Sequence, residues 1–558
     1  MAPTRGTDEL LFVPLGGLGE IGMNLALYGF GPKTNRKWLM VDCGVTFAGP
    51  QLAGVDLIVP DPRFLIQIQR NIVACVITHA HEDHIGAVAD LWPSFKCPLY
   101  ATPFAAGLLQ ARVLNELGAP EIPLKIVAQS SKLSLGPFEV ELIPVAHSIP
   151  ESCALAIRTS LGLVLHTGDW KIDPEPGIGA KTDLKRLAEI GEEGVLALVC
   201  DSTNILREGK SPSEGDVART LHEIIKSARG RVVVTTFASN VARLRAVALA
   251  AAAAGRKVVL VGRAMDRVVA VARECGYLDD VAPFFSPEAF PSLPRDEIVV
   301  LATGSQGENR AAVARISEDD HPIVRLAPGD MVIYSSRTIP GNEREVGRII
   351  NNLIKQGVEV ITDRDALIHA SGHPRRGEVA EFYKLLKPKI AIPAHGEEVH
   401  LNEHARFALE AGASQVIKAH DGDIVLLAPG EAGIIDEAPF GRMAKDGNTL
   451  ISIDDEIFRT RQKLAASGIV TVALAVDRKG EMVGAPDVLL AGIPAKTGSG
   501  AKLDEVVDEA VFQTFEGLPR PQRRDANIVS GAIEKGVRAA VASAWGKKPF
   551  VHVLVLEV

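Results

Sequence analysis

The sequence has few aromatic residues, no excess of basic residues and no long apolar run. Aromatics make up 5% of the 558 residues, and 60 basic residues face 69 acidic ones, a net charge of −9. Such a chain is not expected to coat nucleic acid nonspecifically, although a local basic groove stays open. No apolar run approaches the roughly 18 residues of a membrane span, and "MAPTRGTDELL" at the start is unlike a signal peptide. We therefore expect no membrane association.

The six cysteines are widely separated and include no C-x-x-C pair. Most stand in apolar runs, as reduced and buried thiols do, which argues against a disulfide scaffold and favours the cytoplasm. What remains is ordinary globular usage, with 47% hydrophobic and 23% charged residues. A chain of this length is expected to form two to four domains.

Residues 1–205 consist mainly of short strand patterns joined by turns. Segments such as "LLFVPLGG", "KWLMVDCGV", "IVACVIT", "FEVELIPVAHS" and "LGLVLHTGD" carry alternating or β-branched apolar residues. Many of these strands end on a polar residue. In α/β scaffolds, strand ends and their loops usually carry the chemistry.

Residues 206–365 change to a strand, polar loop, helix rhythm. "RVVVTT" precedes the helix "VARLRAVALAAAAA", and three similar units follow it. Four such units predict a doubly wound parallel sheet. Strand patterns, among them "DALIHASGH" and "PKIAIPAHGEE", return over 366–440. A polar stretch at 441–465 is typical of a linker with a helix, and 466–558 has the pattern of a small α+β domain.

The segment "THAHEDHIGA" places metal-binding residue types directly after an apolar run. Within it His79, His81, Asp83 and His84 form an H-x-H-x-D-H pattern. Histidines at i and i+2 of an extended loop point the same way, and the next two residues can face a second point. Imidazole and carboxylate suit zinc and, with more oxygens, manganese. This loop therefore predicts ligands for two metals, and incidental histidines in a polar loop are the weaker interpretation.

Further donors stand at the ends of other apolar runs. His147 ends "ELIPVAH", Asp169 ends "LVLHTGD" and His395 ends "IAIPAH". Each alone is as readily a capped loop residue as a ligand. Together with the first loop they form a plausible shell, with Asp169 as the bridging carboxylate. His166, three residues before Asp169, is expected to support the site rather than coordinate.

One motif points away from nucleotide binding. Gly17, Gly19 and Gly22 match G-x-G-x-x-G, but the strand-like "MNLALYGF" follows where a dinucleotide fold needs a helix. We interpret the glycines as tight turns between two strands.

At this point the motifs resemble a known superfamily. "VDCG", "THAHEDH", "PVAHS", "HTGDWKIDPEP" and "PAHGE" are similar to the successive motifs of the metallo-β-lactamase fold, an αββα sandwich. The resemblance implies that Asp42 supports the metal loop. It also implies two ligand sets that share one carboxylate: His79, His81, His147 and Asp169 for one metal, and Asp83, His84, Asp169 and His395 for the other.

The separation of Asp169 from His395 exceeds what that fold needs, and the units between them form a domain of their own. This arrangement resembles the β-CASP nucleases. Within them, "CDSTN", "TTFASN", "TGSQGE", "SSRTIPGNE" and "HASGH" resemble the ribonuclease J family. The domains are then a metallo-β-lactamase domain in two parts (1–205 and 366–440), an inserted β-CASP domain (206–365), a linker (441–465) and a C-terminal α+β domain (466–558).

The resemblance implies a two-metal ribonuclease that acts in RNA maturation and decay. It implies 5′-to-3′ exonuclease activity with a preference for RNA that carries a 5′-monophosphate, and endonuclease activity is a further possibility. Zinc is the expected metal, with manganese or magnesium as alternatives. RNA is the expected partner, and the C-terminal domain is expected to form a homodimer or homotetramer. The expected catalytic residues are Asp83, His369 and His373. The expected substrate-binding residues are Phe237, Ala238, Ser239, Asn240, His369, Ala370, Ser371, Gly372 and His373.

The physical interpretation of these loops agrees, since small hydroxyl-bearing loops that open helices favour phosphate. Ordinary helix capping by Ser239 or Asn240 and a structural histidine pair are the competing interpretations. Two positions depart from the family pattern, Ala242 after "FASN" and Pro374 after "SGH". The arginines expected to line a channel, or else to sit on a solvated face, are Arg310, Arg337, Arg364, Arg375 and Arg376.

Two other functions stay open from the sequence. A hydrolase of a small ester or thioester would share the first metal motifs, but it has no need of the inserted domain. A noncatalytic RNA-binding scaffold could keep the fold, but it has no need of seven intact candidate ligands.

Overall fold

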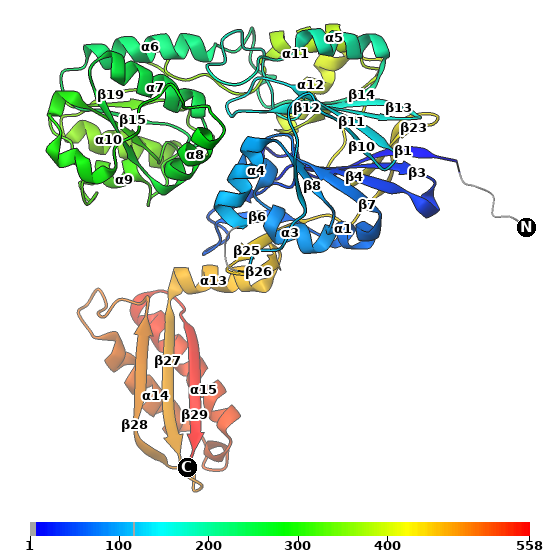
Figure 1. Cartoon of the computed structure of the whole chain (residues 1–558). Coiled ribbons are helices and arrows are strands. Elements are labelled where there is room, and N and C mark those ends of the chain that lie inside the picture. Colours follow the sequence, from blue (N-terminus) through cyan, green and yellow to red (C-terminus); the bar gives the residue numbers. More distant parts are fainter. Residues whose placement is uncertain (1–6, 115–117) are drawn as a thin grey trace, which may run out of the picture. The chain divides into compact units, whose positions relative to one another are not determined.

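The computed structural model describes residues 7–114 and 118–558 and divides into two compact units (Figure 1). The larger unit comprises Met1–Thr46 and Ile58–Arg442, and the smaller comprises Phe47–Leu57 and Met443–Val558. No helix in the described part of the chain has the length and apolar character needed to cross a bilayer.

Two sheets form the core of the larger unit. One has the strand order β24-β23-β1-β3-β4-β7-β8-β9, and the other has the order β10-β11-β12-β13-β14-β20-β22. The strands of the first are β1 (Glu9–Gly16), β3 (Leu25–Gly31), β4 (Lys37–Val41), β7 (Ile72–Val76), β8 (Leu99–Ala101), β9 (Leu124–Ile126), β23 (Asp423–Ala428) and β24 (Gly433–Glu437). Those of the second are β10 (Lys132–Leu135), β11 (Phe138–Pro144), β12 (Cys153–Thr159), β13 (Gly162–His166), β14 (Val195–Asp201), β20 (Ile390–Ala394) and β22 (Gln415–Val416).

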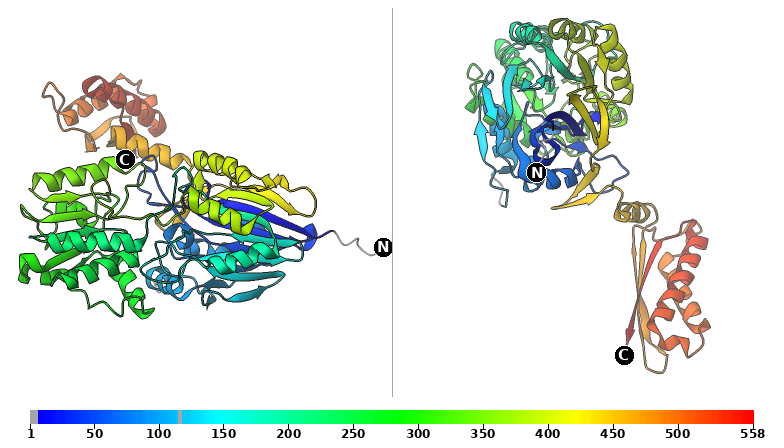
Figure 2. Two further views of the ribbon diagram at one scale, coloured as in Figure 1. Left: turned by 90° about the horizontal axis from the view of Figure 1, so that it is seen from above. Right: turned by 90° about the vertical axis from the view of Figure 1, so that its right-hand side faces the viewer.

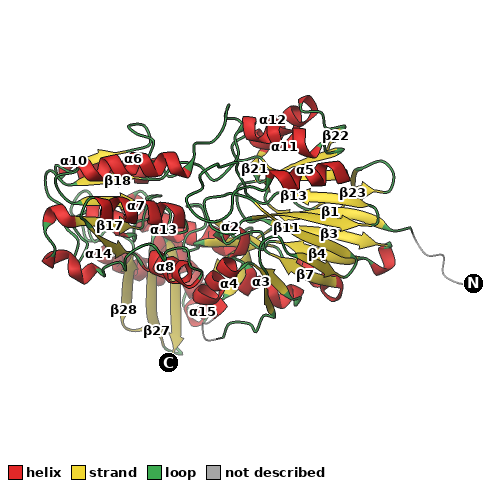
Figure 3. Cartoon of the chain, turned by 45° about the horizontal axis from the view of Figure 1, so that its top comes forward, coloured by secondary structure: helices red, strands yellow, loops and turns green. Residues whose placement is uncertain are grey.

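The inner faces of the two sheets pack on each other. Phe12 and Tyr28 of the first sheet share one buried cluster with Leu142, Leu155 and Ile392 of the second. The outer face of the second sheet is covered by α5 (Leu184–Glu193), α11 (Arg376–Leu386) and α12 (Glu398–Glu410) (Figure 3). On the first sheet, α1 (Arg63–Ile68) packs through Phe64 against Trp38 of β4. The predicted αββα sandwich is therefore confirmed.

The insertion forms a parallel sheet of its own, with the order β16-β17-β15-β18-β19 (Figure 2). Its strands are β15 (Val232–Thr235), β16 (Lys257–Val261), β17 (Ile298–Ala302), β18 (Met331–Tyr334) and β19 (Glu359–Ile361). Its helices are α6 (Glu214–Ser227), α7 (Val241–Ala253), α8 (Arg263–Glu274), α9 (Ala312–Ser317) and α10 (Glu343–Lys355). Each of β15 to β18 is followed along the chain by a helix, and all five strands run parallel, which confirms the doubly wound prediction.

Two local predictions need correction. "DALIHASGH" is not a strand, because residues 365–373 form turns and irregular backbone. Side chains replace the strand pairing there: Arg243 and Ser335 both donate to the carbonyl of Ile368. The segment predicted as a linker holds more than a helix, since β25 (Arg442–Asp446) and β26 (Thr449–Ser452) form a hairpin before α13 (Glu456–Ser467).

The glycine motif forms turns between strands, as predicted. Gly17, Gly19 and Gly22 all have positive φ, of 93°, 86° and 121°. At Gly17 a β-carbon would lie 2.4 Å from the Asn24 side chain, so the chain needs glycine for this close approach. The strand β3 follows directly.

The smaller unit contains a three-stranded sheet of order β28-β27-β29. Its elements are β27 (Ile469–Val476), β28 (Met482–Ala491), β29 (Phe550–Glu557), α14 (Leu503–Gly517) and α15 (Ala526–Trp545). Alternate residues of β27 are buried, and Val470, Val472 and Leu474 pack with both helices in one core. The predicted two-residue alternation thus reflects one face covered by helices.

Candidate metal centre

The metal-binding loop leaves β7 and runs into the short helix α2 (Glu82–Ile85). Asp42, held at a positive φ of 62°, accepts hydrogen bonds from the Thr78 amide at 2.7 Å and the Thr78 hydroxyl at 2.8 Å. Its Oδ2 also lies 2.7 Å from His84 Nδ1. Asp42 thus fixes the start of the loop and orients one ring, the supporting role that the resemblance implied.

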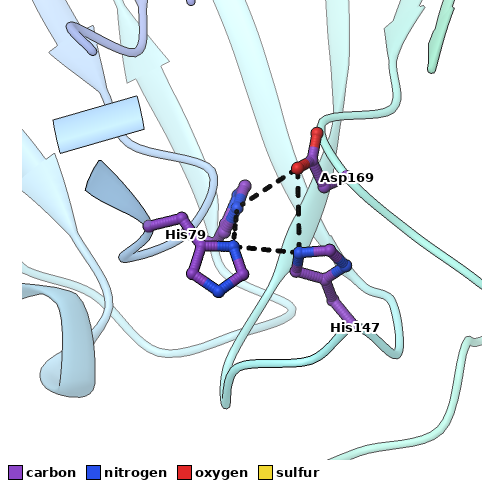
Figure 4. Close-up of side chains that lie close together, drawn as sticks. His79, His147 and Asp169 are labelled. Carbon is purple, nitrogen blue, oxygen red and sulfur yellow. Dashed lines mark hydrogen bonds and ion pairs between the residues drawn. The ribbon is translucent and has the colours of Figure 1, made fainter. Parts of the chain in front are cut away.

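The first predicted ligand set converges in space. The ligand atoms of His79, His81, His147 and Asp169 all lie within 4.8 Å of one another (Figure 4). His81 Nδ1 lies 3.1 Å from His79 Nε2 and 3.0 Å from His147 Nε2, and Asp169 Oδ2 is 3.6 Å from His79 Nε2. Three imidazole nitrogens and one carboxylate oxygen therefore face a common point.

The second set shares Asp169. His84 Nε2 lies 3.4 Å from Asp169 Oδ2 and 3.6 Å from Asp83 Oδ2, and His395 Nε2 lies 3.3 Å from Asp83 Oδ2. Asn24 steadies this side, because its side-chain amide lies 3.1 Å from the Asp83 carbonyl and 3.0 Å from His84 Nε2. The structure brings all seven predicted ligands together, with Asp169 between the two sets.

Burial sets the charge states of these rings. It lowers the pKa of His79 and His147 well below the usual value, and that of His81 to about 4, with neighbouring imidazoles adding to the effect. For His84 burial also lowers the pKa, but Asp169 and the other carboxylates outweigh it and raise the pKa well above its usual value. The three imidazoles of the first set therefore favour the neutral form, which is the form that binds metals. The carboxylates around His84 instead favour a positive charge at the second set.

The residues present fit divalent metal ions. Among the described residues, His395 Nε2 is buried and makes no hydrogen bond, although it lies 3.3 Å from the Asp83 carboxylate. The His147 Nδ1 atom is 2.7 Å from the Gly372 carbonyl, so it carries the proton and leaves the Nε2 lone pair facing His79 and His81. Converging imidazole lone pairs and carboxylates of this kind suit divalent metal ions.

The sequence analysis gave Asp201 no role, although it had singled out "CDSTN". Asp201 ends β14, and its Oδ2 lies 2.8 Å from His373 Nδ1. Burial lowers the pKa of His373, but Asp201 and Asp169 outweigh it and raise the pKa to about 9. Asp201 could have been predicted as a site residue from the sequence, because it is a carboxylate at the end of an apolar run, as Asp169 is.

The loop 369–373 lies against the candidate ligand His147. Gly372 is packed so closely on His147 that a β-carbon would lie 2.6 Å from its ring. Asn204 donates to the Ser371 hydroxyl at 2.8 Å, and Ser211 donates to the His373 carbonyl at 2.9 Å. Predicted residues of this loop therefore reach the metal centre through a backbone carbonyl and a small residue.

The "FASN" loop stands at the end of β15. Asn240 is buried and caps α7, because its side chain accepts from the Arg243 amide at 2.9 Å, so the capping interpretation holds for Asn240. Phe237, Ala238 and Ser239 are half-buried. The side-chain cap of α7 comes from Asn240 and not from these three residues. Among the described residues, no hydrogen bond or ion pair joins this loop directly to the candidate metal ligands.

The arginines differ in their surroundings. Arg310, Arg337 and Arg364 are exposed. Arg376 is tied to Glu403 and lies over the Phe407 ring, with 5.2 Å from its guanidinium carbon to the centroid, which is a structural position. Pro374 is buried at the start of the turn into α11, and Ala242 is buried in α7.

Two further polar residues near the ligand motifs, His166 and Glu82, have partners outside the two ligand sets. His166 Nδ1 lies 2.9 Å from the Tyr28 hydroxyl, which orients the ring, and its expected supporting role stays a prediction. Glu82, the remaining charged residue of the metal-binding segment, pairs with Arg112.

Comparison with known proteins decides the family. Residues 31–230 match the metallo-β-lactamase superfamily model, 229–353 the model of the ribonuclease J β-CASP domain, 357–419 that of the Zn-dependent metallo-hydrolase RNA specificity domain, and 456–558 that of the ribonuclease J C-terminal domain. Ribonuclease J of Sinorhizobium meliloti is 50% identical over 551 residues, covering 99% of this chain and 98% of that protein. The chain belongs to the ribonuclease J family.

Other ribonuclease J proteins agree over the full length. That of Mycolicibacterium smegmatis is 37% identical and covers 100% of this chain and 99% of its own. A solved structure of a protein of unknown function from Enterococcus faecalis V583 covers 75% of this chain with a TM-score of 0.54 at 16% identity, which concerns the fold alone. As a member of the ribonuclease J family, the chain is a metal-dependent ribonuclease.

Proposed function

We propose that this ribonuclease degrades RNA from the 5′ end, prefers a 5′-monophosphate, and also cleaves internally when an RNA reaches the metals without its end bound. The observation that carries the proposal is the loop 369–373, which has partners on both sides. Gly372 at one end accepts from the metal-ligand candidate His147, and Ile368 at the other accepts from Arg243 of the inserted domain at 2.9 Å. One short loop therefore links the site of cleavage to the "FASN" loop.

The seven converging residues are proposed as the ligands of two divalent ions, with zinc expected and manganese or magnesium as alternatives. When bound, such a pair supplies a hydroxide nucleophile and stabilises the charge that develops on the phosphoryl oxygens. The protein's part is to hold the ligands: Asp42 fixes the ring of His84, and Gly372 fixes that of His147.

His373 and Asp201 are proposed to act on the reacting phosphate. The His373 ring lies 5.1 Å from the His147 ring and 5.5 Å from the His395 ring, beside both ligand sets. Asp201 binds its Nδ1 and leaves Nε2 to donate to a phosphoryl oxygen or to the leaving oxygen. His369 is proposed to contact the substrate as a neutral donor, because burial and then Arg243 lower its pKa to about 3.

The 5′-phosphate pocket is proposed to lie between Phe237, Ala238 and Ser239 on one side and the loop 369–373 on the other. Three buried polar atoms support a polar ligand there, since Thr235 Oγ1, Thr236 Oγ1 and His369 Nδ1 have no hydrogen-bond partner among the described residues. The amino end of α7, which follows directly, favours an anion. A pocket at fixed distance from the metals selects a terminal phosphate.

Arg243 holds the two sides of this pocket together. It is fully buried, pairs with Glu214 at 2.9 Å, and donates to Ser335 and Ile368. A buried ion pair of this kind is costly to disturb, so the spacing of the two loops is fixed. The RNA is accordingly proposed to run between the metallo-β-lactamase and β-CASP domains.

The 5′-end proposal is tested by comparing monophosphorylated and triphosphorylated RNA of one sequence. We expect the monophosphorylated RNA to be degraded faster from its end, and Ser239→Asp, which places a negative charge in the pocket, to abolish this difference while internal cleavage persists. Ser227→Asp, on the exposed end of α6, is the control. Equal rates for both RNAs with the unaltered protein would contradict the pocket.

The C-terminal domain is proposed to join copies of the chain into a dimer or tetramer in the cytoplasm. Phe550, Leu554 and Leu556 of β29 and Leu489 of β28 are 43% to 65% exposed. The register places them opposite Ile469, Thr471, Ala473 and Ala475 of β27, on the face that the helices leave open. The apolar side chains on this face, with Thr471 and His552 among them, support association with a second copy.

A further inference from the structure

The turn after the metal-ligand candidate His147 holds Glu151 in an unusual conformation. Glu151 has a φ of 63°, a left-handed value that costs free energy in a residue other than glycine. The turn is tied to the metal loop, because Cys153 donates from its amide to the Thr78 carbonyl at 3.0 Å. Glu151 is therefore placed with some strain, four residues from a metal-ligand candidate.

The two oxygens of the Glu151 carboxylate have partners in different domains. Oε2 accepts from the Phe104 amide at 2.7 Å, at the start of α4 (Pro103–Leu109) in the metallo-β-lactamase domain. Oε1 accepts from the Tyr277 hydroxyl at 2.9 Å, just beyond α8 of the inserted domain. The side chain of one residue with a left-handed backbone thus spans the boundary between the domains.

The helices behind this bridge are closely packed. The rings of Phe104 and Tyr277 meet edge to face with centroids 6.1 Å apart. A β-carbon on Gly107 of α4 would lie 2.6 Å from Val271 of α8, so these helices approach as only glycine allows. The bridge is the polar end of a close contact between α4 and α8.

We propose that Glu151 and Tyr277 are positioning residues that latch the inserted domain onto the turn of His147 and so set the alignment of RNA held by both domains. The inference rests on the proposed path of RNA between the domains. A substrate that occupies only the metal centre does not need this alignment. An RNA bound at both the "FASN" loop and the metals does.

The arrangement allows the two tasks of Glu151 to be separated. Tyr277→Phe removes the bond across the boundary but keeps the ring contact with Phe104. The Glu151 bond to the Phe104 amide stays, so the turn that carries His147 keeps its own support. Tyr334→Phe is the matched control, because the Tyr334 hydroxyl bonds within the inserted domain, to the Gly304 carbonyl at 3.5 Å.

The test measures kcat/KM of both variants on a single-stranded 5′-monophosphorylated RNA and on bis(p-nitrophenyl) phosphate. We expect Tyr277→Phe to slow RNA cleavage about 10-fold, the factor of one hydrogen bond to a charged group, and to alter hydrolysis of the aryl ester less than about twofold. Tyr334→Phe is expected to match the unaltered protein on both. An equal loss on the two substrates, or no loss on RNA, would overturn the latch.

Failure of the latch and failure of the proposed function give different results. If the unaltered protein does not discriminate between 5′ ends, the pocket is wrong whatever Tyr277→Phe does. If it discriminates and Tyr277→Phe cleaves RNA at the normal rate, the pocket stands and the latch is wrong.

Discussion

The two compact units of this chain bury different kinds of side chain. The larger unit buries carboxylates and imidazoles throughout its interior, including Asp42, Asp169, Asp201 and His404. In the described residues of Phe47–Leu57 and Met443–Val558, every buried residue is apolar, glycine or proline. The same chain thus contains a unit that buries charged groups within its apolar cores and a unit whose described core is apolar.

This difference shows where chemistry resides. Buried charge is costly unless it is paired or binds a ligand, so a fold retains it where the charge has a use. The smaller unit instead leaves apolar residues such as Leu554 and Leu556 exposed on one sheet face, which suits a partner. Catalysis and metal binding are therefore expected to depend on the larger unit, and association on the smaller.

The largest expected effect comes from Asp83→Ala. It removes a carboxylate that faces both His84 and His395. We expect the rate of RNA cleavage to fall at least about 1,000-fold, because removing one member of a set of residues that act together in catalysis costs nearly as much as removing the whole set. The measurements are single-turnover cleavage and bound metal by mass spectrometry. Glu82→Ala, one residue away and paired with Arg112, is the control. Full activity in a folded, metal-replete Asp83→Ala protein would refute the two-metal site.

Asp201→Asn is expected to have the next largest effect. The amide cannot balance a charge on His373, and RNA cleavage should fall about 100-fold, within the range of a lost proton-transfer group. Metal content is expected to stay unchanged, because Asp201 is outside both proposed ligand sets. Asp280→Asn, an exposed partner of Arg245, serves as control. A loss of metal together with activity would instead assign Asp201 to the metals.

Much of the fold could be predicted from the sequence. Strand and helix periodicity gave the two strand-rich regions and the parallel sheet, and the seven candidate ligands stood out because they end or closely follow apolar runs. The pairing of Asp201 with His373 spans 172 residues and depends on how β14 meets the loop 369–373, which no local pattern records. The strand predicted for "DALIHASGH" was wrong although its apolar residues have strand spacing. Arg243 and Ser335 donate to the Ile368 carbonyl there, in place of a neighbouring strand.

A smaller effect on catalysis is expected from Leu554→Asp with Leu556→Asp. Two charges on the open face of β29 should dissociate the assembly, observed by light scattering, while cleavage of a short RNA changes less than about twofold, as for a substitution remote from the site. Leu409→Asp, which changes a leucine that is 57% exposed on α12, is the control. An assembly that keeps its mass would place the interface elsewhere.

The smallest effect concerns stability and pH. Burial, then the neighbouring Glu20 carboxylate, raises the pKa of Asp421 to about 8. Because the folded pKa is raised, stability present at low pH is lost as the pH rises from about 4 to about 8. Asp421→Asn should reduce this loss. The melting temperature of its larger unit, relative to that of the unaltered protein, should be about 2 °C more favourable at pH 8 than at pH 5.

The control for this comparison is within the molecule. The smaller unit buries no titratable group among its described residues, so its melting temperature is expected to be insensitive to pH over the same range. Thermal unfolding followed by hydrogen exchange reads the two units separately. Equal pH dependence in both units, or none in the larger, would mean that the buried carboxylates do not set its stability.

The central claim is that two metal ions in the larger unit cleave RNA. The most direct measurement is to titrate a defined divalent metal into metal-free protein and follow cleavage of end-labelled, monophosphorylated RNA. The account predicts no cleavage without metal and full activity once two ions are bound per chain. Cleavage by the metal-free protein, or full activity with a single ion, would contradict it.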